Sequence, residues 1–177
     1  TASNGSGVDQ QTLTITSRKA PVITSPLTFA AVVGQAMTYQ LVSTGTAPLA
    51  LSVSGLPSWA SFDPQTGVLS GTPVSEGEVR VTLQSSNLAG ADARELVIAV
   101  RTTPVITSAL TATAVTGDAF SYTLTASGTP FITRSVTGLP SWLQFDSNTG
   151  VLSGTPTEDG VFTIGLVATS GVGTDTK

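Results

Sequence analysis

Residues 55–73 read GLPSWASFDPQTGVLSGTP, and residues 138–156 read GLPSWLQFDSNTGVLSGTP. The two stretches are offset by 83 residues, and the similarity continues on both sides of them. When residues 21–94 are aligned without a gap on residues 104–177, 36 of the 74 positions are identical. A fixed period of this kind arises when one structural unit is used more than once. It favours arrays, stalks and binding surfaces over catalysis.

Each of these stretches carries the pattern of a β-hairpin. Asp63 can accept hydrogen bonds from the turn backbone, Pro64 presets φ, and Gly67 supplies a position with positive φ. In the second copy, Asp146 and Gly150 hold the corresponding places. We therefore expect two short strands joined by a turn in both units.

Alternating apolar residues predict further strands. Residues 79–83 read VRVTL, their counterparts 162–166 read FTIGL, and residues 37–41, 120–124 and 96–100 also alternate. A period of two places one face on a core and the other in water. No segment shows the 3.6-residue stripe of an amphipathic helix. Short strands separated by Gly and Pro indicate a β-sandwich.

Large aromatic residues recur beside each hairpin, namely Trp59 with Phe62 and Trp142 with Phe145. A small domain without disulfides needs large side chains to bury enough apolar area. We predict that these four residues anchor the two cores. The alternative is that exposed tryptophans stack on sugar rings, which would indicate a carbohydrate-binding module.

The composition narrows the function classes. Charged residues make up 10% of the chain and the net charge is −4, so we expect no nucleic-acid partner. No apolar run is long enough to span a membrane. The sequence contains no Cys and no His, which removes thiol chemistry and His-based catalysis. We expect that the chain is not an enzyme.

The ordered motif of both copies, Gly-Leu-Pro-Ser-Trp followed by Phe-Asp-x-x-Thr-Gly-Val-Leu-Ser-Gly-Thr-Pro, resembles the He_PIG Ig-like repeats and the dystroglycan-type cadherin-like repeats. This resemblance implies an all-β fold of tandem Ig/cadherin-like, seven-stranded Greek-key sandwiches. It also implies an extracellular or cell-surface location in large bacterial surface or secreted proteins. Some relatives bind calcium, but the acidic linkers of true cadherins are missing here, and residues 100–104 read VRTTP.

Four aspartates are the candidate metal ligands: Asp63, Asp92, Asp146 and Asp175. Asp63 and its repeat counterpart Asp146 are also explained as turn caps. The other two recur in a Gly-rich loop, where one carboxylate supplies too few of the six to eight oxygens that Ca²⁺ takes. We expect no cofactor and little calcium dependence, with Ca²⁺ at these aspartates as the alternative.

The sequence does not contain a whole number of repeats. Residues 1–20 align with residues 84–103, and nothing corresponds to Glu95–Thr103 after Lys177. We therefore divide the chain into residues 1–20, the last strand and linker of a preceding repeat; 21–103, a complete repeat; and 104–177, a repeat without its last strand. An open sheet edge is expected beside a strand over Phe162–Ala168.

The missing pattern reappears at the N-terminus, where Leu13 and Ile15 hold the positions of Leu96 and Ile98. One hypothesis is that these residues complete the last repeat of another copy and so build a filament. The alternative is that a longer parent chain supplies the missing strand. The candidate complementing residues are Thr12, Leu13, Thr14, Ile15 and Thr16.

Three functions fit these patterns. The first is a structural repeat segment of an extracellular fibre, adhesin stalk or sheath, whose partners are neighbouring repeats or copies of itself. The second is a module that binds a surface glycan or a protein receptor. The third is an accessory domain of a larger secreted enzyme.

Overall fold

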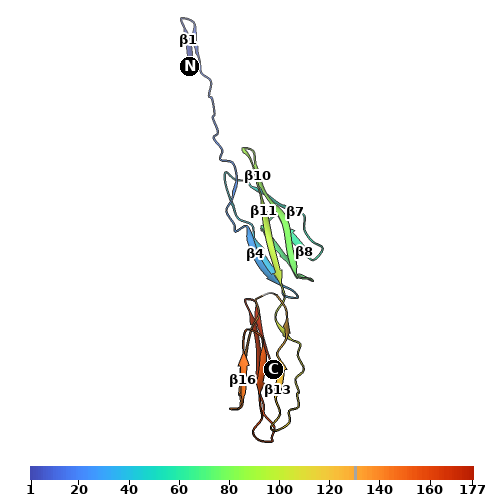
Figure 1. The fold of residues 1–177 in the computed structure, drawn as a ribbon. Helices are drawn as coiled ribbons and strands as arrows, with labels where there is room; N and C mark the ends of the chain where they lie inside the picture. The colour runs from blue at the N-terminus through green and yellow to red at the C-terminus, as the bar shows by residue number, and fades with distance from the viewer. Residues whose placement is uncertain (130) are drawn as a thin grey trace.

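The computed structural model describes residues 1–129 and 131–177, with only the backbone described for Ser3 and Asn4. Two β-units lie end to end, and a thin N-terminal extension leaves the first unit on the side away from the second (Figure 1). In the described residues, every regular element is a β-strand. None of those residues forms a helix suited to crossing a membrane.

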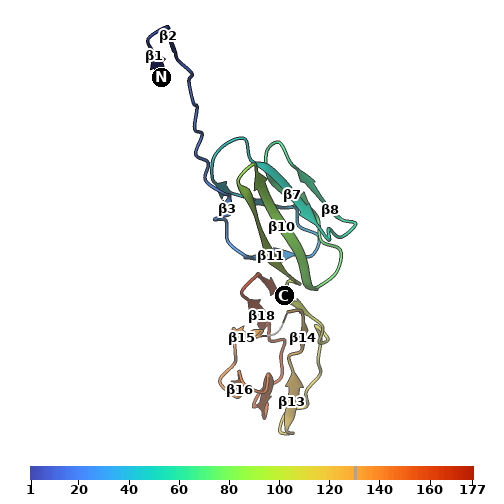
Figure 2. The same ribbon diagram turned by 90° about the horizontal axis from the view of Figure 1, so that it is seen from above.

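The first unit has two layers, which Figure 2 shows from a second direction. One layer has the strand order β4 (Thr28–Val32), β11 (Gly90–Arg101), β10 (Gly77–Asn87), β7 (Ala50–Ser54). The other has the order β5 (Met37–Gln40), β9 (Val68–Gly71), β8 (Ala60–Asp63), and the short strands β3 (Val22–Ile23) and β6 (Ser43–Thr44) pair beside them. All pairs are antiparallel except β4 with β11. This arrangement is an Ig-like sandwich.

The core of the first unit lies between these layers and uses the alternating residues. On β10, Val81 and Leu83 are buried, and on β11, Leu96 and Ile98 face them with no exposed area. From the opposite layer, Leu69 packs on the same cluster. The period-two pattern therefore identified the inward faces of these strands.

The second unit repeats the layout with two three-stranded sheets. Their orders are β13 (Phe120–Thr123), β17 (Val151–Gly154), β16 (Leu143–Asp146), and β15 (Thr133–Thr137), β18 (Gly165–Ser170), β19 (Gly173–Thr176). Strands β12 (Val105–Ile106) and β14 (Ala126–Ser127) pair like β3 and β6. No described strand of this unit corresponds to β4.

The strand expected over Phe162–Ala168 begins only at Gly165, so the prediction was wrong for residues 162–164. In the first unit, the corresponding part of β10, Val79–Val81, pairs with Leu96–Ile98 of β11. Strand β4 also pairs with β11 through residues 97–101. Among the described residues of the second unit, no strand takes the place of this part of β11. Residues 109–116 and 162–164 therefore lack the backbone hydrogen bonds that would make them strands.

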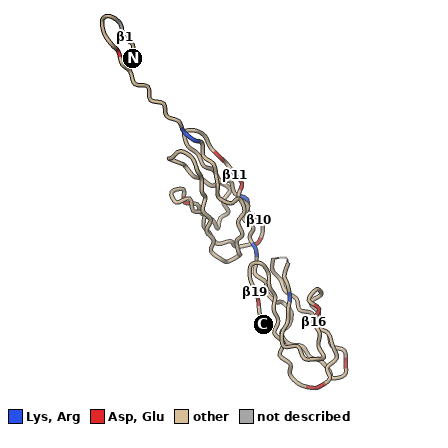
Figure 3. The backbone as a smooth tube through the Cα atoms, turned by 90° about the vertical axis from the view of Figure 1, so that its left-hand side faces the viewer, with Lys and Arg blue, Asp and Glu red and all other residues tan. Residues whose placement is uncertain are grey.

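The N-terminal extension matches the end of the first unit in its backbone pairing. Strands β1 (Ala2–Asn4) and β2 (Gly7–Asp9) form a hairpin in which Asn4 is opposite Gly7, as Asn87 is opposite Gly90 at the end of β10 and β11. Residues 10–20 then run to the first unit without regular structure. Figure 3 shows this thin segment and the sparse charges along the molecule.

The same hydrogen-bond pair joins the extension to the first unit and the first unit to the second. The Lys19 amide donates to Thr46 Oγ1 at 2.7 Å, and the Thr46 amide donates back to the Lys19 carbonyl oxygen at 3.0 Å. One period later, Thr102 and Thr129 make these two bonds at 2.7 and 3.2 Å. Each unit is thus entered through the same contact.

Candidate functional site

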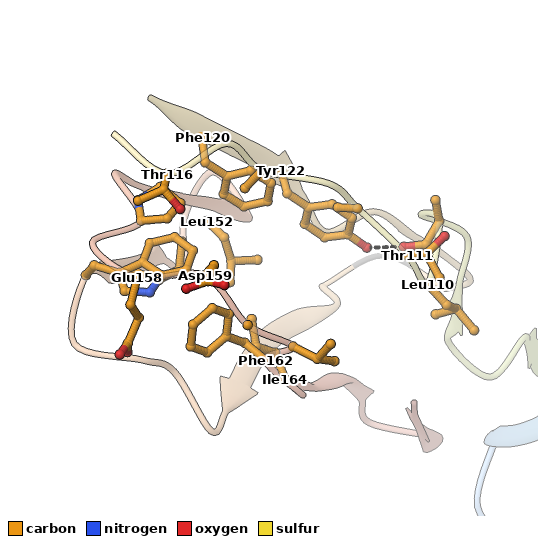
Figure 4. A pocket seen from close by; sticks show the side chains of 18 of the residues that line it. Leu110, Thr111, Thr116, Phe120, Tyr122, Leu152, Glu158, Asp159, Phe162 and Ile164 are labelled. Atoms are coloured by element: carbon orange, nitrogen blue, oxygen red, sulfur yellow. Dashed lines mark hydrogen bonds between the residues drawn. The ribbon is translucent and has the colours of Figure 1, made fainter. Parts of the chain in front are cut away.

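A groove of about 460 Å³ lies in the second unit. One wall is the irregular segment that begins at Leu110 and Thr111, and Phe162 and Ile164 form the opposite wall (Figure 4). Phe120, Tyr122 and Leu152 contribute from β13 and β17. We call this feature the edge groove. Most of its lining residues are apolar, and Glu158 and Asp159 add two carboxylates.

The edge groove occupies the place that the second half of β11 fills in the first unit. There, Leu96, Ile98 and Val100 are at most 4% exposed and cover the neighbouring core. Their absence leaves the second core open on this side: Ala31 is 4% exposed, whereas its counterpart Ala114 is exposed. The groove is therefore a strand-shaped gap in the sandwich.

Three aromatic rings form one end of the edge groove. Trp142 packs edge-on against Phe120 and Phe162, with ring centroids 6.2 and 5.5 Å apart and interplanar angles of 84° and 79°. The indole Nε1 of Trp142 is buried without a hydrogen-bond partner among the described residues. This cluster packs against the irregular segment that carries Phe162.

The four aromatic residues predicted as core anchors are partly buried. Trp59 and Phe62 pack against the core cluster of the first unit, and Phe145 packs against that of the second. Trp142 lines the edge groove instead.

A tyrosine, buried in the first unit and half-buried in the second, ties each unit's first loop to its sheet. The Tyr122 hydroxyl lies 2.7 Å from both Ser108 Oγ and the carbonyl oxygen of Ala109, at the start of the groove wall. Tyr39 makes the same contacts with Ser25 and Pro26 in the first unit. Burial raises the pKa of Tyr39, and the hydrogen bond with Ser25 partly offsets that rise.

Two of the aspartates proposed as metal ligands cap the hairpin turns. Asp63 accepts hydrogen bonds from the Thr66 hydroxyl at 2.7 Å and the Gln65 amide at 2.9 Å. Both bonds lower the pKa of Asp63, and the bond from the Thr66 hydroxyl has the larger effect. Asp146 accepts from the Asn148 amide and the Thr149 hydroxyl, both at 2.9 Å, and these bonds lower its pKa in turn.

The other two aspartates connect the last strand to the first. Asp92 accepts the Ile23 amide at 2.8 Å and lies 3.0 Å from Arg94 Nε. The bond from the Ile23 amide is the main cause that lowers the pKa of Asp92, and Arg94 adds to it. In the second unit, Asp175 accepts the Ile106 amide at 2.8 Å and pairs with Lys177 at 3.1 Å. The bond from the Ile106 amide is the main cause that lowers the pKa of Asp175, and Lys177 adds to it.

The four aspartates are thus separated and each is engaged within its own turn or strand pair. Within residues 1–129 and 131–177, no three His, Cys, Asp or Glu side chains gather as a metal site would require. Calcium binding stays a prediction to be measured.

The predicted complementing residues lie far from the edge groove of their own chain. Leu13 and Ile15 are 82% and 83% exposed in the N-terminal extension. That extension leaves the first unit at the end opposite to the second (Figure 1). The structure therefore places the apolar strand pattern and the gap that resembles its site at opposite ends of the molecule.

Sequence reasoning missed the segment that forms the groove's other wall. Residues 109–116 carry no strand in the second unit, whereas β4 is ordered beside β11 in the first. The repeat alignment could have indicated this, because the counterpart of β4 would pair with the counterparts of residues 97–101, which the second unit does not contain.

Comparison with known families places both units in one group. The He_PIG profile, described as "Putative Ig domain", matches residues 20–102 and 103–177. The chain is also 35% identical over 158 residues to the "Serine-rich adhesin for platelets" of Staphylococcus aureus strain N315. That match covers 81% of this chain but only 7% of the relative. In strain USA300, the identity is 36% over 143 residues, which covers 75% of the chain and 6% of the relative.

Solved structures with the same fold are tandem Ig-domain proteins. The I67–I69 fragment of titin covers 89% of this chain and 63% of its own with a TM-score of 0.63 and 18% identity. The N-terminal eight Ig domains of the Down syndrome cell adhesion molecule cover 89% of this chain and 26% of their own, with a TM-score of 0.68 and 15% identity. At these identities the likeness concerns the fold.

Proposed function

The chain belongs to the He_PIG family of Ig domains, and from this premise we propose that it is a structural repeat segment of an extracellular fibre, adhesin stalk or sheath. The observation that carries the proposal is the repeated junction. Lys19 with Thr46 and Thr102 with Thr129 make the same reciprocal pair of hydrogen bonds at successive unit entrances. An array joined in this way keeps one geometry from unit to unit.

The short junction suits a spacer. Strand β11 ends at Arg101 and β12 begins at Val105, so few residues lie between the two sandwiches. Pro104 fixes its own φ and disfavours a helix in the residue before it. The Thr102 hydroxyl also donates to Glu76 of the first unit at 3.0 Å. These contacts limit hinge motion between neighbouring units.

A spacer role agrees with the relatives. The relative named as an adhesin matches this chain over a small part of its own length. We therefore propose a location at the cell surface or outside the cell.

Small-angle scattering tests the spacer proposal. We expect the purified chain without residues 1–16, which lie outside the two units, to scatter as a rod of two end-to-end units. The control carries a flexible Gly-Ser linker between Arg101 and Pro104. A native curve that matches this flexible control would contradict the proposal.

A further inference from the structure

We propose that the outer edge of β15 in the second unit binds an extended peptide segment of another protein, and that an acidic side chain of this peptide pairs with Arg134. Such a binding surface goes beyond the spacer role and does not depend on it. Two features of β15 carry the proposal, namely an unpaired sheet edge and a cation without a partner.

Strand β15 is an outer strand of its sheet and lies beside β18 (Figure 2). The first unit has β7 at the same edge of its four-stranded sheet, so this edge belongs to the repeat itself. Neither strand contains Lys, Pro, Asp or Glu, which often block pairing at sheet edges. Arg134 is the only charged residue of β15. The edge is thus open to a further strand.

The hydrogen bonds of β18 show which backbone groups of β15 face the open side. Leu166 exchanges backbone bonds with Lys177 at 2.9 and 3.0 Å, so its amide and carbonyl point away from β15. Neighbouring residues of a strand point their backbone groups to opposite sides, so Val167 bonds to Ser135, which lies opposite it. By the same alternation, the amide and carbonyl of Arg134 face outward, where an added strand would lie.

Arg134 stands where the first unit has a leucine that packs on the core. Its counterpart Leu51 is half-buried against the first core cluster. A Cβ on Gly67 would lie 3.1 Å from Leu51 Cδ1, and a Cβ on Gly150 would lie 3.3 Å from Arg134 Cδ. Both side chains therefore pass beside the hairpin turn of the opposite sheet. The aliphatic part of Arg134 replaces the leucine, and the guanidinium extends beyond it.

The guanidinium of Arg134 has no partner in the described part of the chain. Its Nε is buried without a hydrogen bond. Asp146, the acid of the neighbouring turn, already accepts two bonds from that turn. Lys177, the other cation of the second unit, pairs with Asp175. A partly buried guanidinium without an acceptor is unfavourable, so a carboxylate from another protein would satisfy a group that this chain leaves unpaired.

An antiparallel strand would use both features at once. The peptide residue opposite Arg134 would exchange two backbone bonds with it and point its side chain to the same face. A glutamate at this position brings a carboxylate to the guanidinium. Apolar residues two places before and after it would face Val136 and Ile132, which pack against the second core cluster. The fitting partner is therefore an alternating strand with an acid at its centre.

An exposed aromatic residue precedes the same edge. Phe131 is 94% exposed, and its φ of 69° is a left-handed conformation that phenylalanine rarely adopts. The first unit has Pro48 at this position. Strain of this kind persists where the surrounding structure or a function requires it. Phe131 precedes the end of β15 that meets the C-terminal part of an antiparallel peptide, so it offers that part an apolar contact.

The experiment measures binding of a fluorescein-labelled peptide, Thr-Val-Thr-Glu-Thr-Val-Thr, to the 177-residue chain by fluorescence anisotropy. We expect saturable binding. Replacing the Glu of the peptide by Gln should weaken it about tenfold or more, because a charge-assisted hydrogen bond is lost. Arg134→Leu should have a similar effect. This variant carries the residue that the first unit has as Leu51, and circular dichroism checks that it folds.

Methylated peptides separate strand addition from a simple contact between charges. A methyl group on the backbone nitrogen of the Glu removes the donor for the Arg134 carbonyl oxygen and should abolish binding. The same group on the following Thr, whose amide would point to solvent, should leave binding almost unchanged. Equal effects of the two methyl groups would contradict an added strand.

Three other results would overturn the proposal. The first is no binding of the Glu peptide. The second is tighter binding by Arg134→Leu, which would show that the cation guards the edge against added strands. The third is self-association of the native chain in sedimentation velocity that Arg134→Leu abolishes, which would show that the edge takes a second copy. The rod measurement concerns the junction and is independent of all three.

Discussion

Ser85 is a buried hydroxyl in an otherwise apolar core. It has no exposed area, and its Oγ has no hydrogen-bond partner among the described residues. One period later, the same place is taken by Ala168, which is also fully buried. The second copy thus shows that a side chain without the hydroxyl fits this position.

We predict that Ser85→Ala stabilises the first unit by about 1 kcal/mol, because it removes a polar group that is buried without a partner. Urea denaturation measures the change. The control is Ser86→Ala on the adjacent residue of β10, which should shift the midpoint little. A Ser85→Ala variant that is less stable than the native chain would show that the hydroxyl has a favourable contact.

Asp92 links stability to pH. Its pKa is lowered by the hydrogen bond from the Ile23 amide and by Arg94. A carboxylate whose pKa is lower in the folded state stabilises that state above its unfolded value of about 4. The contribution disappears as the pH falls through the folded pKa. Asp63, Asp146 and Asp175 act in the same direction.

We therefore predict that the chain loses stability as the pH falls below about 4. Asp92→Asn should lower stability at neutral pH and flatten this acid loss, since the amide retains an acceptor but does not titrate. Urea midpoints between neutral and strongly acidic pH measure both effects. Equal acid slopes for the native and variant chains would exclude Asp92 as a contributor.

At the scale of elements, β17 lies so close to the backbone at the start of β16 that Gly154 leaves no room for a side chain. A Cβ on Gly154 would collide with the Trp142 carbonyl oxygen and lie 3.1 Å from the Leu143 Cα. Gly71 has the same role beside Trp59 in the first unit. The repeated Ser-Gly-Thr-Pro sequence thus reflects close packing as well as the end of a strand.

We predict that Gly154→Ala destabilises the second unit by about 1–3 kcal/mol, because the neighbouring backbone must move. Thermal unfolding followed by circular dichroism measures this. Gly171→Ala is the control, since no atom lies within 4 Å of the place that its Cβ would take and its φ is outside the left-handed region. Similar losses in the two variants would contradict the packing explanation.

Most elements could be predicted because their patterns are local. The turn at Asp63, the alternation on β10 and the repeat of both in the second unit follow from neighbouring residues. The start of β18 could not be predicted from alternation, because Phe162 and Ile164 have the pattern of a strand but lack the partner residues that complete the ladder. The contact of Asp92 with Ile23 joins residues 69 positions apart, which no local pattern indicates.

At the scale of the whole molecule, the pattern of one repeat appears in the first unit, in the second unit and in the N-terminal extension. The first unit has its last strand in place, the second has a groove where the last half of that strand would lie, and the extension has the strand pattern without a unit around it. Leu13 and Ile15 are 82% and 83% exposed, while Leu96 and Ile98 have no exposed area. The same apolar pattern is therefore buried where a unit surrounds it and exposed where the structure has no unit around it.

A distance measurement across the junction tests the fixed unit-to-unit geometry most directly, and labels can be placed freely because the sequence contains no cysteine. Gln65 and Asn148 are exposed and hold the same position in the hairpin turns of the two units. We predict that spin labels on Gln65→Cys and Asn148→Cys in one chain give a single narrow distance distribution by pulsed electron paramagnetic resonance. A distribution as broad as that of the same labels in the variant with the Gly-Ser linker would contradict a fixed junction.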